Sequence, residues 1–169
     1  IVFGDWSSDV CSSDLGGDVI LGELDAGTAA VAVIASGGIL DLGTDTSAVD
    51  ITAGDLILTA GTNIGASDNH LEIAAGNLSS RSTAGDTFIR ESDAVTVTDL
   101  SVTVERVGAT GASGTTDPAD VQEDLISGGV LVLTTVDGAI TVDGGTAKAA
   151  ESIEAAGNIL LQTAELDEA

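Results

Sequence analysis

The chain of 169 residues has few of the residues that usually fill a large globular core. It contains no Met and no Tyr, two Phe and one Trp, so that aromatic residues make up 2% of the sequence. Hydrophobic residues nevertheless reach 43%, supplied mostly by Ala, Val, Ile and Leu. Small aliphatic side chains stacked in rows fill a thin interior, whereas thicker cores normally use several large rings. The scarcity of aromatics therefore favours a narrow all-β structure.

Basic residues are also scarce. Four Lys and Arg stand against 28 Asp and Glu, which gives a formal net charge of -24 at pH 7. Such a surface repels phosphate backbones and anionic lipids, so we expect no nucleic-acid partner. The longest apolar run, Ala29 to Ala35, is too short to span a bilayer, and we expect no membrane insertion.

The single cysteine, Cys11, lies in a segment unlike the rest of the chain. Residues 5–15, DWSSDVCSSDL, look like the translation of a common sequencing adapter read in frame. We therefore treat residues 1–15 as non-native, expect them to be disordered and leave them out of fold reasoning. Without this segment the chain has no cysteine, which excludes disulfide and thiol chemistry.

A short phrase recurs from residue 16 onward: Gly, a polar residue or a second Gly, then a run rich in aliphatics. Between the copies lie alternating runs such as Leu71-Glu72-Ile73, in which the aliphatic side chains point one way and the polar one points the other. Residues 54–77 read as one complete turn of a coil, because Gly76-Asn77 repeats Gly54-Asp55. The copies are Gly17-Asp18-Val19-Ile20-Leu21, Gly54-Asp55-Leu56-Ile57-Leu58, Gly85-Asp86-Thr87-Phe88-Ile89, Gly128-Gly129-Val130-Leu131-Val132 and Gly157-Asn158-Ile159-Leu160-Leu161.

Repeated short strands of this kind predict a solenoid, in which each coil buries its apolar side chains by stacking on its neighbours. The turns carry no consistent two-residue hairpin signal. We predict one domain over residues 16–169, an all-β parallel β-helix with roughly six or seven coils of about 20 to 25 residues. A β-roll and a β-sandwich are the alternatives.

Residues 108–127 depart furthest from the phrase and predict an insertion. Asp117-Pro118 suits the start of a helix, and Ala119 to Ile126 has a helix-compatible composition, so we predict about two helical turns. The insertion would either cover one edge of the stack or form a recognition loop. For residues 147–156 we predict a strand and turn with Ile153 inward, because the phrase resumes directly afterwards.

Four stretches carry a resemblance to a known family: ITAGDLILTAGTNIGASDNHLEIAAGNLSS, AGDTFIRESDAVTV, GGVLVLTTVDGAITV and AAGNILLQTAE. They resemble the repeat region of very large secreted bacterial proteins of the filamentous-haemagglutinin-like or adhesin-like type, and the resemblance covers nearly everything from Gly17 to the end of the chain. It implies a right-handed parallel β-helix, and it brings no catalytic residues. His70 departs from the pattern, because Pro is expected before Leu71.

The resemblance implies a non-enzymatic role in adhesion or matrix formation. We expect a structural shaft segment of a large exported adhesin or extracellular matrix protein, located outside the cell or at the bacterial surface. Its expected partners are the neighbouring coils of the same longer chain and a host-surface or matrix glycan or protein. No cofactor is expected, with calcium as the exception considered next.

A calcium-binding secreted β-roll module is the first alternative. Asp-rich turns present carboxylate and carbonyl oxygens to a hard cation, and Asp41, Asp45 and Asp50 are the candidate ligands. The β-roll pattern GGxGxDxUx is not met in register, however, since residues 37–41 contain only a fragment of it.

A polysaccharide-active β-helix enzyme is the second alternative. Its chemistry needs carboxylates clustered on one outer face, and outward Asp41, Asp50 and Glu72 would stack on adjacent coils. Sugar sites usually also offer aromatic platforms, and Phe88 is the one aromatic residue after residue 15. We therefore expect no enzymatic activity.

Other polar residues receive structural interpretations. His70 lies beside Ser67 and Asp68, but neighbours in a turn do not give the geometry of a nucleophilic triad, so we expect an exposed histidine. The adjacent opposite charges Arg90-Glu91 and Glu105-Arg106 are expected at the surface. Stacked turn ladders are expected to include some of Asn63, Asn69, Asn77 and Asn158.

Overall fold

The computed structural model describes residues 14–15, 17–44, 48–107, 111, 113–116, 121–143 and 153–163. These residues form strands and contain no helix, which confirms the all-β prediction. The strands are β1 (Asp14–Leu15), β2 (Val19–Leu21), β3 (Leu24–Asp25), β4 (Val31–Ala35), β5 (Ile39–Asp41), β6 (Ile51–Ala60), β7 (Leu71–Ser82), β8 (Thr87–Glu91), β9 (Val95–Val97), β10 (Val104–Val107), β11 (Ser113–Thr116), β12 (Leu125–Ser127), β13 (Leu131–Thr135), β14 (Ile140–Val142), β15 (Ile153–Ala155) and β16 (Ile159–Thr163).

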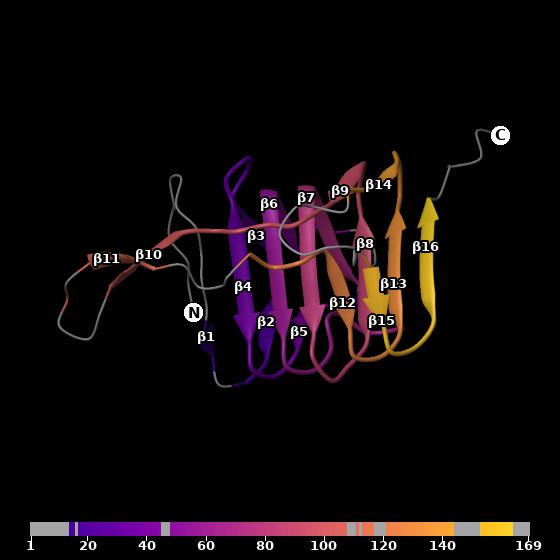
Figure 1. The fold of residues 1–169 in the computed structure, drawn as a ribbon, viewed down its shortest axis with the longest axis horizontal. Helices are drawn as coiled ribbons and strands as arrows, with labels where there is room; N and C mark the ends of the chain where they lie inside the picture. The colour runs from indigo at the N-terminus through magenta and orange to yellow at the C-terminus, as the bar shows by residue number, and fades with distance from the viewer. Residues whose placement is uncertain are drawn as a thin grey trace.

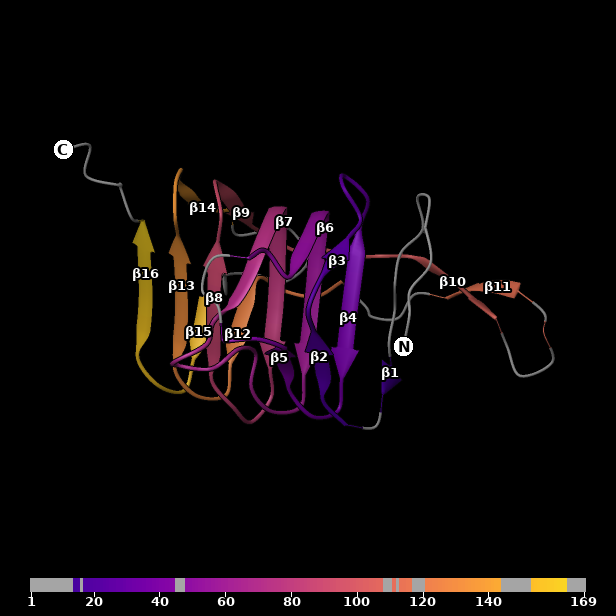
Figure 2. The same ribbon diagram turned by 180° about the vertical axis from the view of Figure 1, so that it is seen from behind.

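Parallel pairing dominates the molecule, and β10 with β11 is the one antiparallel strand pair among the described residues. In Figures 1 and 2 the strands lie side by side from β4 to β16. Most of the pairs fall into three strips, and the pairing of β7 with β8 (Leu71–Ile73 with Ile89–Glu91) connects strip 3 to strip 2. Strip 1 contains β1, β4, the second halves of β6 and β7, β12 and β15. Strip 2 contains β2, β5, Ile64, β8, β13 and β16, and strip 3 contains β3, the first halves of β6 and β7, β9 and β14.

The chain visits these strips in a fixed order. It passes through strip 1, strip 2 and strip 3, and then returns to strip 1 beside its previous pass. We call one such passage a circuit. Asp55 pairs in register with Asn77, so the sequence repeat across residues 54–77 coincides with the register between β6 and β7.

The interior of the circuits is aliphatic. Leu56 on β6 pairs in register with Leu78 on β7, and Leu58 lies two residues further along β6. All three side chains are 0% exposed. The main buried cluster consists of Val, Ile, Leu and Ala side chains and contains none of the aromatic residues among those described. The absence of large rings therefore agrees with a core that only small side chains fill.

The Gly-polar phrase has a physical cause at the entrance to strip 2. Asp86 Oδ1 accepts the backbone N–H of Val130 in the next circuit at 2.7 Å, while a Cβ on Gly129 would lie 2.1 Å from the same oxygen. Glycine is thus needed at this position, because the polar side chain of the previous circuit occupies the space that a Cβ would fill. The same bond joins Asp18 to the N–H of Gly38 at 2.7 Å and Asn63 to the N–H of Asp86 at 2.9 Å.

The copy of the phrase at Gly54 occupies a different place. Leu56–Leu58 pair with Val31–Val33 in strip 1, whereas the other copies lead into strip 2. Gly54 lies inside β6, where a Cβ would meet the carbonyl oxygen of Thr28 at 2.3 Å. The recurring sequence therefore occurs at two different places in the circuit, before strip 1 and before strip 2.

The chain leaves the strips between β9 and β12, and we call residues 98–124 the strap. Leu100 and Val102 pack against Ala32 and Ile57, in a cluster separate from the main core. The two legs of the strap pair through Leu100 and Gln122, and β10 and β11 lie beyond β4 in both views (Figures 1 and 2). This long segment therefore covers part of the outer face of strip 1.

The helix predicted over Ala119 to Ile126 is wrong for the residues that the structure describes. Residues 121–124 are not helical, and Leu125–Ser127 form β12, which pairs with β7 on one side and β15 on the other. Pairing on both sides outweighs a helix-compatible composition. The strand predicted near Ile153 is confirmed as β15, with Ile153 packed against the core.

At the beginning of the described chain, Asp14–Leu15 form β1 beside β4, although they belong to the segment set aside as non-native. The part of the chain that the structure describes offers no helix that would suit a membrane span.

Candidate functional site

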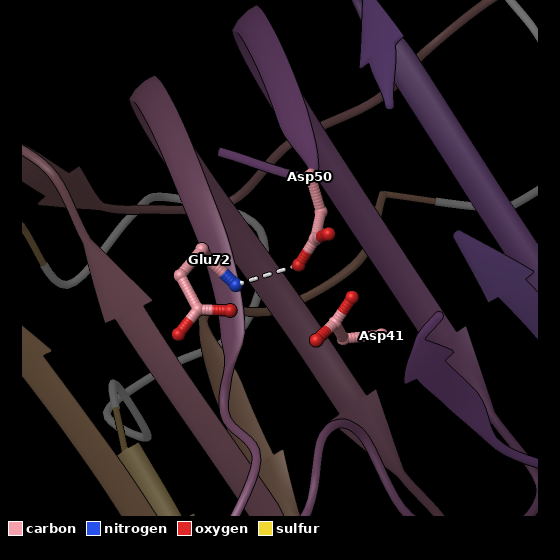
Figure 3. A group of neighbouring side chains, drawn as sticks. All are labelled: Asp41, Asp50 and Glu72. Carbon is pink, nitrogen blue, oxygen red and sulfur yellow. Dashed lines mark hydrogen bonds between the residues drawn. The ribbon is translucent and has the colours of Figure 1, made fainter. Parts of the chain in front are cut away.

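Three carboxylates from neighbouring circuits meet in one cluster, which we call the carboxylate trio. Asp41 ends β5, Asp50 directly precedes β6, and Glu72 is the second residue of β7. One oxygen of each lies within 4.8 Å of the others (Figure 3). Asp50 is 2% exposed and Glu72 is 4% exposed, while Asp41 is partly buried. The structure thus joins two predicted calcium ligands to Glu72, and Asp45 lies outside the described residues.

Strand register brings the trio together. Asp50 donates its backbone N–H to the carbonyl oxygen of Glu72 at 2.8 Å, and the N–H of Glu72 donates to Asp50 Oδ2 at 3.0 Å (Figure 3). Asp41 holds the following turn, because its Oδ1 accepts the N–H of Gly43 at 2.9 Å. The predicted stacking of these three residues is confirmed, but the two buried members are far less exposed than outward residues should be.

Burial changes the proton affinity of the trio. Desolvation raises the pKa of Asp50 from 3.8 to about 7, the bond from the Glu72 N–H opposes that rise, and the charges of Asp41 and Glu72 add to it. The trio therefore suits a bound proton or a hard cation, both of which neutralise clustered carboxylates.

A cleft of about 340 Å³ lies next to the trio and shares Glu72 with it. Its wall includes Arg90, which is paired in register with Glu72 on one side and Thr134 on the other. Charges of both signs therefore face the same hollow. The lining residues are Ser67, Asp68, His70, Glu72, Arg90 and Thr134.

The expectation that His70 is simply an exposed turn residue is wrong. Its side chain is partly buried and its ring stacks on Phe88, with centroids 5.7 Å apart and an interplanar angle of 21°. Burial first, and the nearby charge of Arg90 second, lower the pKa of His70 below its usual 6.5. The histidine is therefore mainly neutral at pH 7.

Glu91 was expected at the surface, and that prediction is wrong. It is 0% exposed; its Oε2 accepts the N–H of Ala75 at 3.0 Å and its Oε1 accepts the N–H of Ser92 at 2.9 Å. Burial raises its pKa from 4.5 to about 7, although these N–H groups pull the value down. The alternation was the missed signal, because Thr87, Ile89 and Glu91 share the inward face of β8.

Asp124, at the end of the strap, is a second buried acid that the sequence analysis missed. It is 1% exposed, and burial raises its pKa from 3.8 to about 6, with Asp99, Glu123 and Asp143 adding to the rise. Its position in an acidic stretch that was predicted to be helical gave no sign of burial. Packing of the strap against the outer face accounts for it.

No protein-family model, curated protein or solved structure matches this chain.

Proposed function

We propose that the chain is a right-handed parallel β-helix that serves as a structural shaft segment of a large exported bacterial adhesin or extracellular matrix protein. The observation that carries this proposal is the repeating order of the three strips. A chain that returns to the same strip beside its previous pass, always in parallel, winds around one axis. Such a winding extends by repetition, which is what a shaft requires.

The mechanical role follows from the hydrogen bonds. Each described strip runs along the proposed axis, so that a pulling force along it loads several backbone ladders together. Side-chain caps add to these ladders, as Asn77 Nδ2 does by donating to Asp55 Oδ1 at 2.7 Å. The net charge of -24 keeps neighbouring shafts apart at low salt.

The outer edge of β16 exposes apolar side chains that a further circuit would cover. β16 pairs with β13, and its Ile159, Leu160 and Leu161 are 48%, 46% and 39% exposed. In the preceding circuit, the paired Leu131 and Leu133 are 0% and 1% exposed. A further circuit stacked on β16 would bury the exposed side chains in the same way.

Analytical ultracentrifugation over a concentration series tests this assignment. The isolated chain should associate reversibly, more strongly in salt that screens its charge, and Leu161→Lys on β16 should weaken the association. Val121→Lys is the matched control, because Val121 is 47% exposed but lies on the strap. A monomer that does not change with concentration or salt would contradict the open-ended shaft.

The proposed location is the cell exterior or the bacterial surface, and the proposed partners are further circuits of the same chain and a host-surface or matrix glycan or protein. No catalysis is proposed. Binding of the chain to a glycan array measures whether this segment itself contributes to adhesion. The Arg90→Ala variant, which alters the cleft, is compared on the same array.

A calcium-dependent module is the alternative function, and the carboxylate trio is the observation that favours it. Calcium takes six to eight oxygen ligands, and the trio supplies carboxylates from only three residues. A passive shaft should melt at nearly the same temperature in chelator and in millimolar calcium. Calcium at a hundredfold excess over its Kd would raise the free energy of unfolding by about 2.7 kcal/mol. A rise in melting temperature that corresponds to this gain would favour the calcium-dependent module.

A further inference from the structure

One circuit carries an inserted loop on strip 2. Thr87 and Ile89 lie two positions apart on β8, but their partners Ile64 and Leu71 lie seven positions apart in the preceding circuit. The difference is five residues, and residues 66–70 therefore leave the strip as a loop. Loops that a regular scaffold holds in place are common positions for binding residues.

The loop is held at both ends and to its neighbours. Ala66 and Asn69 close it, because the N–H of each donates to the carbonyl oxygen of the other, at 2.8 and 3.2 Å. Asn69 Nδ2 also donates to the carbonyl oxygen of Gly43 at 3.0 Å, which fastens the loop to the preceding circuit. Gly65 precedes the loop with a φ of 65°, and a Cβ there would lie 2.2 Å from the carbonyl oxygen of Phe88. The loop is therefore a preformed wall.

This wall bounds the cleft of about 340 Å³, a volume within the range of small-ligand sites. The loop contributes Ser67, Asp68 and His70, and the strands contribute Glu72, Arg90 and Thr134, which form one row across β7, β8 and β13. The His70 ring stacks on Phe88, with centroids 5.7 Å apart. The cleft thus combines an aromatic wall with polar groups on two sides.

The polar groups of the cleft favour an uncharged ligand. An anion would meet Asp68, Glu72 and a chain with a net charge of -24, whereas a cation would meet the guanidinium of Arg90. The hydroxyls of Ser67 and Thr134 both donate and accept, and Arg90 and Asp68 add a donor and an acceptor. A sugar ring matches this set, because its hydroxyls donate and accept in the same way while its C–H face packs against an aromatic ring.

We propose that the cleft binds one neutral hexose unit of a glycan, held between the loop of residues 66–70 and the row that contains Arg90 and Thr134. The proposal rests on the proposed function in one respect, because it names the glycan partner of the shaft segment. Its failure is distinguishable from failure of the shaft, since centrifugation decides the shaft without any sugar.

Nuclear magnetic resonance of the full chain at fixed pH tests the cleft. His70 is the single histidine, so its imidazole gives one assigned signal. The probes are neutral trisaccharides built from glucose, galactose, mannose or their N-acetylated forms, added to about 10 mM, which exceeds a weak Kd of about 1 mM. At least one probe should move the His70 signal to saturation, with a Kd of about 1 mM or lower.

Thr134→Val removes one hydroxyl of the cleft and keeps the shape of the side chain. The Kd should rise at least about fivefold, because a hydrogen bond to the sugar is lost. Thr141→Val is the matched control, since Thr141 is exposed on β14 and does not line the cleft, and it should keep the parent Kd. Equal Kd values in the two variants would refute the proposal, as would a panel in which no neutral probe moves the His70 signal.

Deletion of residues 66–70 gives a second test, because it restores the two-residue spacing between Ile64 and Leu71 and removes one wall. Calorimetry should detect no sugar binding by this variant, while circular dichroism keeps the strand signal. Binding equal to that of the parent chain would overturn the proposed cleft, and Thr134→Val decides if the deletion variant does not fold. An acidic trisaccharide or a lysine-rich peptide that saturates the His70 signal at lower concentration than every neutral probe would overturn the proposed ligand class.

Discussion

The middle of the stack and its C-terminal edge contain nearly the same sequence in very different surroundings. Leu56 and Leu58 follow Ala-Gly-Asp within β6 and are 0% exposed, whereas Ile159 and Leu161 follow Ala-Gly-Asn in β16 and are 48% and 39% exposed. β6 has β4 on one side and β7 on the other, while β16 pairs with β13 alone among the described strands. Burial in this fold is therefore a property of the neighbours and not of the strand itself.

The strongest way to sharpen this comparison is a matched pair of truncations. Leu58→Ala should lower the free energy of unfolding by about 2–5 kcal/mol, because it leaves a cavity enclosed by neighbouring circuits. Leu161→Ala, at the edge, should cost less than about 1 kcal/mol, since water already reaches the side chain. Urea unfolding followed by circular dichroism measures both, and equal losses would show that the edge is covered in solution.

Glycine replacements give the next largest contrast. A Cβ on Gly61 in the middle would lie 1.9 Å from the carbonyl oxygen of Ser36, whereas a Cβ on Gly17 at the start meets nothing within 4 Å. We expect Gly61→Ala to destabilise by about 1–3 kcal/mol through forced backbone shifts. Gly17→Ala should be neutral or slightly stabilising. Thermal melting separates the two, and indifference at Gly61 would disprove the close packing of adjacent circuits.

The smallest expected contrast compares two glutamines. Gln122 on the strap donates to the carbonyl oxygen of Leu58 at 3.0 Å and accepts from the hydroxyl of Thr59, while Gln162 on β16 is exposed. Gln122→Ala should cost about 1–2 kcal/mol, because a buried acceptor loses its donor, and Gln162→Ala should cost almost nothing. Denaturant midpoints measure the difference. Matching midpoints would mean that the strap contributes nothing to stability.

Much of the strand pattern was predictable from local alternation. Leu71-Glu72-Ile73 gives two inward aliphatics, and the repeat from Gly54 to Asn77 has the register that the sequence predicted. The burial of Glu72 was not predictable in this way, because it depends on Asp41 and Asp50, which lie beside it from neighbouring circuits. Glu91 was misjudged for the opposite reason: its parity in β8 pointed inward, but its charge suggested the surface.

The strap marks the limit of sequence reasoning. Residues 119–126 have a composition that suits a helix, and only the partners β7 and β15 make Leu125–Ser127 a strand. The candidate site is similar, since Asp41 and Asp50 were found from acidic turns alone, while the position of Glu72 between them and Arg90 depends on register across separate circuits.

The bond between Asp86 and Val130 spans 44 residues of sequence, yet it has the same form and the same 2.7 Å length as the bond between Asp18 and Gly38, which spans 20. The stack therefore re-enters its register after a long detour. Chain length beyond the paired residues Leu100 and Gln122 can therefore change without altering this register, which makes that outer part of the strap a natural position for grafting foreign peptides onto the scaffold.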